Sequence, residues 1–406
     1  MCFVTVPHPL GMISKEEVNA KVDAAFDDIM KAATAWTPSK EKQDAQVKPY
    51  PAKRFKFSGT YADVNDMFQK RKWSLSLPIV PPTVDKVAAM LKGTKRNPAE
   101  VLWVVPPRQG MLTVELVAAL GVMAGAKPEH MPLLIATVEA MADPVAAWRG
   151  PTTTTAATVP VFFISGPIIE KLKLNPGTGT AGGENPVTNA LGYFVNLVGD
   201  VVGGSVPPNF DKSTHGSSAD LVAMVFTENA KENPWKTTYA EEAGFKPGDS
   251  IVTHFSAYLG NANIDHDSKT GQRLLTTLST GLLGSASGLA SCLADYDATY
   301  AINNKVSFAF IVLCPEHAAT IAKDFPDQRA ARDFMRETAA MPYKFYSQET
   351  CVPGKDFGPY DENTFIPRFK KTESIKFFVS GGPGKQSQIW VPFPQVFKPV
   401  SKKIAE

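Results

Sequence analysis

The feature that most constrains the fold of this chain is a recurring unit: a continuous apolar run, a turn of proline or glycine, and a stretch with helical character. The unit occurs at VLWVVPPRQG (101–110), VPVFFISGP (159–167), VSFAFIVLCPEH (306–317) and IKFFVSGGPGK (375–385). Strands that are apolar throughout are buried on both faces, and their alternation with helices is typical of a layered α/β architecture. We therefore predict an α/β fold built of strand–turn–helix units. After the last unit, WVPF favours a further strand over a helix.

The length of the chain predicts more than one core. With 406 residues it exceeds the usual size of a single core, so we expect two packed lobes. We place an N-terminal helix and linker arm at 1–54, a first lobe at 55–200 and a second lobe at 201–406, which ends in a strand with a glycine turn. The runs at 159–167 and 306–317 align loosely, which indicates an internal duplication. Within the arm, residues 15–35 carry apolar side chains at the spacing of an amphipathic helix.

Composition excludes several classes of partner. A net charge of +2 gives no reason to expect nucleic acid, and no apolar stretch reaches the roughly 18 residues that a membrane span requires. The four cysteines lack paired spacing and the N-terminus lacks a signal-peptide pattern, so we expect a cytoplasmic protein. Neither a dinucleotide fingerprint nor a P-loop is present, so no cofactor is predicted. We expect a small-molecule substrate and a homo-oligomer, most simply a homodimer.

The position of a ligand site follows from the predicted architecture. In layered α/β folds the turns after the strands gather at one edge, where helix N-termini also point, and ligands bind there. Two glycine-rich loops, 176–192 and 203–220, are long and rich in small polar residues. Long loops of this kind often carry function, and we expect these two to cover the ligand site.

A Pro-Glu-His step occurs twice, in KPEH (127–130) and CPEH (314–317). Proline at the first helical position and an acid in the first turn are ordinary helix starts, which account for Pro315 and Glu316. A histidine in the first turn is not explained in this way, because a cation is disfavoured there. His317 is therefore a candidate general base, and Glu316 a candidate for moving protons. A thiol before a helix can have a lowered pKa, so Cys314 is a candidate nucleophile.

Two further histidines are candidates for catalysis or for metal binding. His215 lies in STHGSS, among residues too small to pack it into a core, and is a candidate catalytic group. His254 ends the strand-like IVTHF and could face the same space. If a divalent metal is bound, His215 and His254 are its candidate ligands. His266, between two aspartates in NIDHD, is more simply a solvated turn.

Polar residues after the predicted strands provide the remaining candidates. Glu228 and Asn229 follow DLVAMVF, where a carboxylate can act as a general base and an amide can bind substrate. Arg108 follows the first strand, where its guanidinium would suit a carboxylate or phosphate. In SGGPGKQS (380–387), the glycine turn with Gly381, Gly382 and Lys385 resembles an anion-binding nest, although a plain turn between strands is the favoured interpretation.

Several of these motifs together resemble one known family. The motifs are WSLSLPIVPPTVDKVAAML, VVPPRQGMLTVELVAALGVMAGAKPEH, ENPVTNALG, ENAKENPWKTTYAEEAGFKPGDSIVT, CPEHAATIAKDF and VSGGPGK, spread over residues 55–395. They are similar to a largely uncharacterised bacterial family associated with the UGSC-motif (seleno)protein group. The resemblance implies common ancestry but supplies no reaction. This chain keeps the following polar residues of the family pattern: Arg108, Glu115, Glu129, Asn189, Glu228, Asn229, Glu316 and His317. The resemblance therefore adds Glu115 and Asn189 to the candidate substrate-binding residues.

This chain also departs from the family pattern at several polar positions. The pattern reads WTDGLPIVPPT where this chain has WSLSLPIVPPT, and PPRWGEATVEK where it has PPRQGMLTVEL. MAGCxPEY becomes MAGAKPEH, which puts Ala126 at the cysteine position, ENEE becomes ENAK, and SPEH becomes CPEH. So many changes together indicate a reaction different from that of the relatives, or the loss of one.

Our leading hypothesis is an enzyme that acts on a small anionic or polar substrate by acid–base chemistry in a cleft between two lobes. Its reaction class would be lyase, hydrolase or isomerase, without a cofactor or assisted by a metal. The alternatives are a non-catalytic member of the family that binds a ligand or partner, and an enzyme with a metal or with Cys314 as nucleophile.

Overall fold

The computed structural model describes residues 4, 6, 13–35, 50–183, 185–207, 215–258, 260–284, 308–346, 361–393 and 396–405. The chain forms two compact units, Met1–Lys48 and Pro49–Glu406. The first unit corresponds to the predicted N-terminal arm. The predicted boundary near residue 200 does not divide compact units, because the strands on either side of it share one sheet.

The helix expected at 15–35 is α1 (Lys15–Thr34). Its N-terminus carries a capping box: the Ser14 side chain accepts from the backbone N–H of Glu17, and the Glu17 carboxylate accepts from that of Ser14. The apolar stripe of α1 is solvent-exposed, with Phe26 53% and Met30 45% exposed. The linker predicted after this helix falls mostly on residues 36–49, outside the described residues.

The larger unit contains two four-stranded mixed sheets, and their strand orders are β12-β5-β3-β4 and β10-β7-β11-β6. The strands of the first sheet are β3 (Thr158–Ser165), β4 (Met224–Thr227), β5 (Ile251–Tyr258) and β12 (Val400–Lys403). Those of the second are β6 (Asn261–Ile264), β7 (Ala309–Leu313), β10 (Ile375–Val379) and β11 (Gln386–Trp390). The predicted α/β class is therefore confirmed.

The two sheets repeat one pattern of strands. In the first, β3 has a parallel neighbour, β4, and an antiparallel neighbour, β5, which pairs antiparallel with β12. In the second, β7 has parallel β10 and antiparallel β11, which pairs antiparallel with β6. Equivalent hydrogen bonds join Glu228 N to Ile164 O and Ser380 N to Leu313 O, both at 2.9 Å. This repetition of topology is what the predicted internal duplication requires.

The two halves exchange their fourth strands. The chain passes from β5 directly into β6 of the other sheet, and from β11 into β12 of the first sheet. Two isolated bridges also join the sheets, Glu228 to Ser380 and Ala257 to Pro392, and each links equivalent positions of the repeat. The halves are thus related by an approximate twofold axis and are interlocked, which explains why they form one compact unit.

The first recurring apolar unit does not form a strand followed by a helix. VLWVVPPRQG instead makes a hairpin of β1 (Val101–Val105) and β2 (Gly110–Thr113), and α5 (Val114–Met123) begins only after it. The other units fold as predicted: β3 leads into α8 (Ile168–Lys171), β7 into α13 (Pro315–Asp324), and β10 through a turn into β11. The difference arises because Gln109, with a φ of 61°, closes a tight turn that returns the chain antiparallel.

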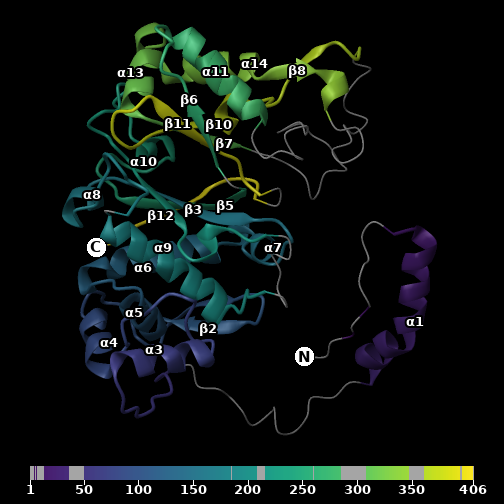
Figure 1. The fold of residues 1–406 in the computed structure, drawn as a ribbon, viewed down its shortest axis with the longest axis vertical. Helices are drawn as coiled ribbons and strands as arrows, with labels where there is room; N and C mark the ends of the chain where they lie inside the picture. The colour runs from purple at the N-terminus through teal and green to yellow at the C-terminus, as the bar shows by residue number, and fades with distance from the viewer. Residues whose placement is uncertain are drawn as a thin grey trace. The chain divides into compact units, whose positions relative to one another are not determined.

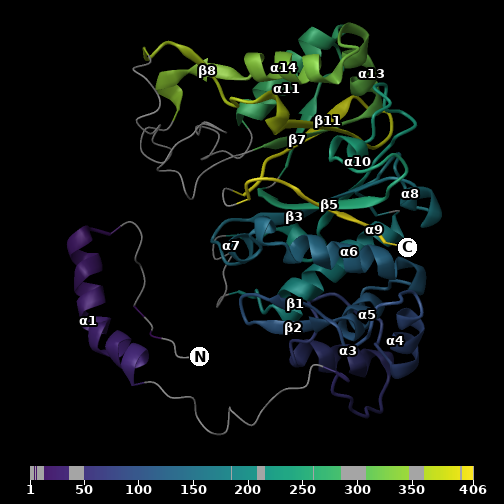
Figure 2. The ribbon, with the colours of Figure 1, turned by 180° about the vertical axis from the view of Figure 1, so that it is seen from behind.

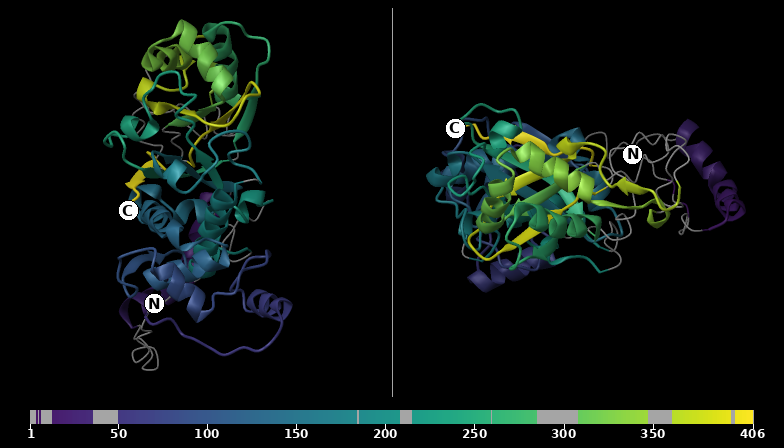
Figure 3. Two further views of the ribbon diagram at one scale, coloured as in Figure 1. Left: turned by 90° about the vertical axis from the view of Figure 1, so that its left-hand side faces the viewer. Right: turned by 90° about the horizontal axis from the view of Figure 1, so that it is seen from above.

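Helices cover the outer faces of the paired sheets (Figure 1). The green helices at the top of Figure 1 lie on the β7 sheet; they are α11 (Gly271–Gly284), α13 and α14 (Gln328–Thr338). On the other side lie α6 (Met131–Ala142) and α9 (Pro186–Asn196), and beyond them α3 (Tyr61–Lys70), α4 (Val84–Leu91) and α5. The view from behind (Figure 2) and the side view at the left of Figure 3 show the same succession of layers. The short elements are α7 (Arg149–Thr152), α10 (Tyr239–Glu242), β8 (Ala340–Pro342) and β9 (Phe365–Pro367).

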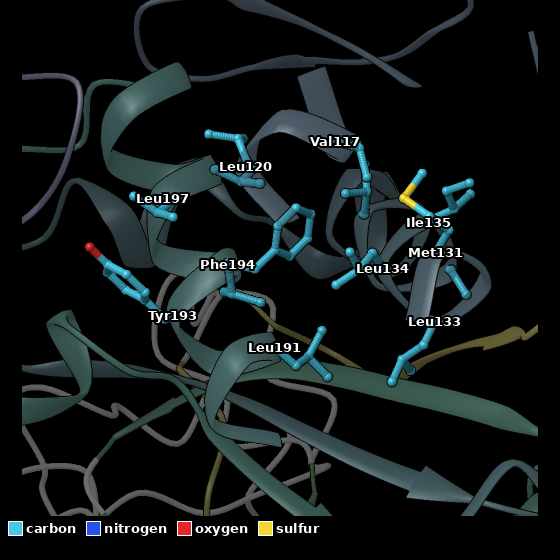
Figure 4. Close-up of a cluster of buried hydrophobic side chains, with 14 of the residues drawn as sticks. Val117, Leu120, Met131, Leu133, Leu134, Ile135, Leu191, Tyr193, Phe194 and Leu197 are labelled. Carbon is cyan, nitrogen blue, oxygen red and sulfur yellow. The ribbon is translucent and has the colours of Figure 1, made fainter. Parts of the chain in front are cut away.

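The helical layer next to the β3 sheet has its own apolar core. Side chains of α5, α6 and α9, among them Val117, Leu134 and Phe194, converge above the sheet in Figure 4. These helices are apolar on most sides because α6 packs on β5 and α5, α9 packs on β4 and α5, and α5 is covered by α4. No helix within the described residues has both the length and the apolarity to cross a bilayer.

Aromatic side chains fill the space between the two sheets. Phe163 of β3 stacks on Phe310 of β7 at a centroid distance of 4.4 Å, and also contacts Phe226, Phe255 and Phe378. Such ring pairs stabilise a fold beyond the area that they bury. Phe163 is therefore a central contact between the halves.

We predict that Phe163→Ala lowers the free energy of unfolding by about 3–5 kcal/mol, because it opens a cavity between the sheets. Urea denaturation followed by fluorescence measures this loss. Phe365→Ala is the matched control: Phe365 is 67% exposed, and the expected change is within about 0.5 kcal/mol. Equal stability of the two variants would contradict the role of Phe163.

Candidate functional site

The ends of four strands meet at one edge of the paired sheets. The parallel pairs β3–β4 and β7–β10 each end at the same edge of their sheet, and the bridge from Glu228 to Ser380 joins the two edges. This is the edge at which a ligand site was predicted. The candidates that the structure brings to it are Cys314, Glu316, His317, Glu228, Asn229, Gly381, Gly382 and Lys385.

Cys314 and His317 lie in the first turn of α13, directly after β7. Cys314 is the N-cap residue, and its backbone N–H donates to Ser387 Oγ at 3.3 Å. His317 Nδ1 lies 2.8 Å from the same Ser387 oxygen, and Nε2 lies 3.1 Å from the backbone carbonyl oxygen of Asp265. That carbonyl can only accept, so Nε2 carries a proton and Nδ1 faces the Ser387 hydroxyl.

The thiol and the imidazole shift each other's ionisation. Burial opposes ionisation of Cys314, but its interactions with His317 outweigh the burial and lower the pKa of the thiol. Burial likewise opposes protonation of His317, yet the interaction with Cys314 prevails and raises the pKa of the imidazole. Both shifts favour a thiolate–imidazolium pair, which is the arrangement of an activated cysteine.

Glu316 occupies the predicted anion-binding nest. Its Oε2 accepts hydrogen bonds from the backbone N–H of Gly384 at 2.6 Å and of Lys385 at 3.0 Å. These bonds, the one from Gly384 foremost, lower the pKa of Glu316. The nest therefore exists but holds a carboxylate of the protein itself. The Lys385 ammonium donates to the backbone oxygen of His266, so it does not point freely to a substrate.

The glycine turn at 381–382 is held against the first glycine-rich loop. Gly381, with a φ of 86°, donates its N–H to Pro176 O at 2.9 Å and accepts from Asn229 Nδ2 at 3.0 Å. A side chain at Gly382 would collide with Thr178. The loop around 176–180 therefore lies against this edge of the sheets. The second loop, 203–220, is described only in part, because 208–214 fall outside the described residues.

Glu228 is buried between the sheets. Its Oε1 accepts the backbone N–H of Tyr239 at 2.7 Å, and its Oε2 accepts the hydroxyl of Ser165. Burial raises the pKa of this carboxyl to about 6, although the bonds from Ser165 and Tyr239 oppose the shift. Glu228 is only 3% exposed and holds the start of α10 against β3. Its contacts are those of a group that joins elements of the fold.

His254 belongs to the core. It lies in β5, fully buried, with Nδ1 3.1 Å from Val161 O and its ring stacked on Phe162 at 4.5 Å. Burial lowers its pKa to about 3, so the imidazole is neutral. Within the described part of the chain, no three His, Cys, Asp or Glu side chains form a group that could hold a metal ion.

Four other candidates lie away from the hydrogen bonds that surround His317, Glu316 and the glycine turn at 381–382. Arg108 is exposed in the β1–β2 turn, and His215 is exposed beside the second loop. Glu115 accepts from Ala52 N at 2.7 Å and so anchors the chain that leads into the body. Asn189 donates to Gly183 O and lines a surface pocket of about 250 Å³ next to β4.

The structure separates the two Pro-Glu-His steps. His130 Nδ1 accepts the backbone N–H of Lys127 at 3.0 Å, and burial lowers its pKa, so it is a neutral helix cap.

Asp265, in the NIDHD turn, bonds through its side chain to Ser268 and Thr277. Ser387, which bonds to His317, is a site residue that was not predicted from the sequence. Its only signal was its place in SGGPGKQS, two residues after the nest lysine.

Comparison with protein-family models and with curated proteins gives no match to this chain. The resemblance to the UGSC-motif group accordingly stays a prediction from the sequence motifs.

We predict a pH dependence of stability from Glu228. The folded state binds this proton more tightly than the unfolded state, with a pKa of about 6 against 4.5. Protonated Glu228 therefore adds about 2 kcal/mol to the free energy of unfolding below about pH 4.5. This contribution is lost as the pH rises through 6. Glu228→Gln should remove this decline, as measured by urea unfolding between about pH 4 and pH 7.

The matched control for that experiment is Glu337→Gln, since the Glu337 side chain is 65% exposed. It should keep the wild-type decline with pH. A Glu228→Gln variant whose stability follows the wild-type curve throughout would show that Glu228 does not titrate in this range.

Proposed function

We propose that this protein is an enzyme that acts on a small polar or anionic substrate, with Cys314 and His317 as its reacting groups. One observation carries the proposal: Cys314 and His317 lie together at the N-terminus of α13, where both bond to Ser387 Oγ, and the Asp265 carbonyl orients the imidazole. A nucleophile, a base beside it and a group that orients the base are the parts of covalent catalysis.

The geometry supports a role for each group in this proposal. His317 Nε2–H is held by the Asp265 carbonyl, so Nδ1 is the nitrogen that takes the thiol proton. The resulting thiolate can attack an electrophilic carbon, and the imidazolium can return the proton to the leaving group. This chemistry fits a hydrolase or lyase. Ser387 Oγ lies beside both Nδ1 and the Cys314 backbone nitrogen and positions the two residues.

A binding protein without turnover is the second candidate, and a specific observation favours it. Six side chains expected to act on or bind substrate are bonded to the protein itself: Glu115, Asn189, Glu228, Asn229, Glu316 and Lys385. A protein of this kind would bind a ligand with equal affinity whether or not the thiol is present.

We predict that iodoacetamide labels Cys314 in the native protein, with a rate that rises around a midpoint below the usual thiol pKa of about 8.5. His317→Gln should move this midpoint upward, because it removes the group that stabilises the thiolate. Mass spectrometry of the modified peptide measures the rate at each pH. Cys314→Ser, which keeps the other three cysteines, identifies the signal.

Turnover provides the complementary measurement. On a panel of small esters, amides and hydroxy acids, Cys314→Ser should lower kcat of any substrate turned over by about a hundredfold or more. An unreactive Cys314 in the folded protein would overturn the thiol mechanism. Ligands that raise the melting temperature equally in wild type and Cys314→Ser, without turnover of any, would favour the binding protein.

A further inference from the structure

A pocket of about 570 Å³ opens at the end of the second sheet opposite to Cys314. Its wall includes Phe308, just before β7, and Lys376, near the start of β10, whereas Cys314 and Ser380 follow the ends of these strands. Side chains of α10 and of the chain around the start of β12 complete the wall. A volume in this range is typical of sites for small organic molecules.

The wall combines apolar rings with positive charge. Phe308 is buried, Phe245 is half-buried, and Phe397 is 51% exposed. Three ammonium groups, those of Lys371, Lys376 and Lys398, belong to the same wall. Lys371 and Lys398 are exposed and take no part in the ion pairs of the pocket acids, although Lys398 also interacts electrostatically with Asp143.

The two acids of the wall are already neutralised. Glu242 Oε1 binds Arg332 at 2.5 Å and Lys376 at 3.4 Å, and Glu373 binds Arg329 at 2.5 Å. The arginines come from α14 and fix these carboxylates in place. The pocket as a whole therefore keeps an excess of positive charge, which attracts anions.

The other pockets of similar size differ in this respect. The pocket beside Trp103 and Trp148, of about 540 Å³, carries one arginine and one aspartate. The pocket beside Leu75, of about 470 Å³, carries one lysine and two aspartates. Among these pockets of the described chain, an excess of cations beside several aromatic rings is found only at Phe308.

We propose that this pocket binds a small organic anion with a flat apolar group, such as an aryl carboxylate or aryl sulfonate. The ring of the ligand would lie against Phe308 and Phe397, and its acid group would be held by Lys371 and Lys398. The apolar contact would fix the position of the ligand, and the positive charges would select a ligand that is negatively charged. The site is separate from Cys314 and does not depend on the function proposed above.

Fluorescence titration with anilinonaphthalene sulfonate tests the proposal, because this probe is itself an aryl sulfonate. The double variant Lys371→Glu/Lys398→Glu should weaken its binding about tenfold, as loss of charge-assisted bonds does. Lys86→Glu/Lys95→Glu, at two exposed lysines of another part of the unit, makes the same change of net charge and should bind as the wild type does. Equal weakening in both double variants, or in neither, overturns the proposal.

Two further arms examine the apolar wall. Phe397→Ala should weaken the probe about fivefold, and since this ring is largely exposed, the fold should be kept. Naphthoate should displace the probe, whereas inorganic phosphate at matched ionic strength should not. The aryl anion site would be refuted if phosphate displaced the probe as effectively as naphthoate does. It would also be refuted if the Phe397→Ala variant bound the probe as tightly as the wild type. Unchanged circular dichroism of each variant ensures that a loss of binding is not a loss of fold.

Discussion

The exchange of the fourth strands between the two sheets is the constraint on which the rest of this structure depends. Because β6 follows β5 in the chain but completes the other sheet, and β12 likewise follows β11, neither half can close its sheet alone. Each half must therefore fold against the other. The aromatic cluster around Phe163 and Phe310 then fills the space that this pairing encloses, and apolar burial stabilises the arrangement.

The repeat also positions the chemistry of the candidate site. At equivalent places after their central strands, the first half has Ser165 and the second has Cys314. Ser165 gives its hydroxyl to the buried Glu228, which faces Ser380 across the bridge between the halves. Cys314 instead meets an imidazole. One half therefore has a fixed polar contact at the position where the other half has a thiol with a lowered pKa.

Many candidate groups prove to be bonded within the protein, for a physical reason. A buried carboxylate or amide must find hydrogen-bond partners, or the fold loses their solvation. Buried Glu228 takes the backbone N–H of Tyr239 and the Ser165 hydroxyl, and Asn229 takes the Gly381 carbonyl. Polar residues after strands are therefore as well suited to join sheet edges as to bind substrate, and residue type alone does not separate the two uses.

The sequence alone determined the class of fold, the helix at α1, and the strand–turn–helix passages at β3 and β7. These follow from local apolar patterns, proline turns and caps, which act over a few residues. It also placed Cys314, Glu316 and His317 at a helix start, because that start is a local feature.

Only the tertiary structure decided the hairpin at Arg108, the shared sheet across residue 200, and the burial of His254. It alone brought Ser387 and Asp265 to His317, from positions 70 and 52 residues away along the chain. Such contacts depend on which strands pair and in which register. Pairing over long separations is settled by the burial of whole sheet faces, to which no short stretch of sequence corresponds.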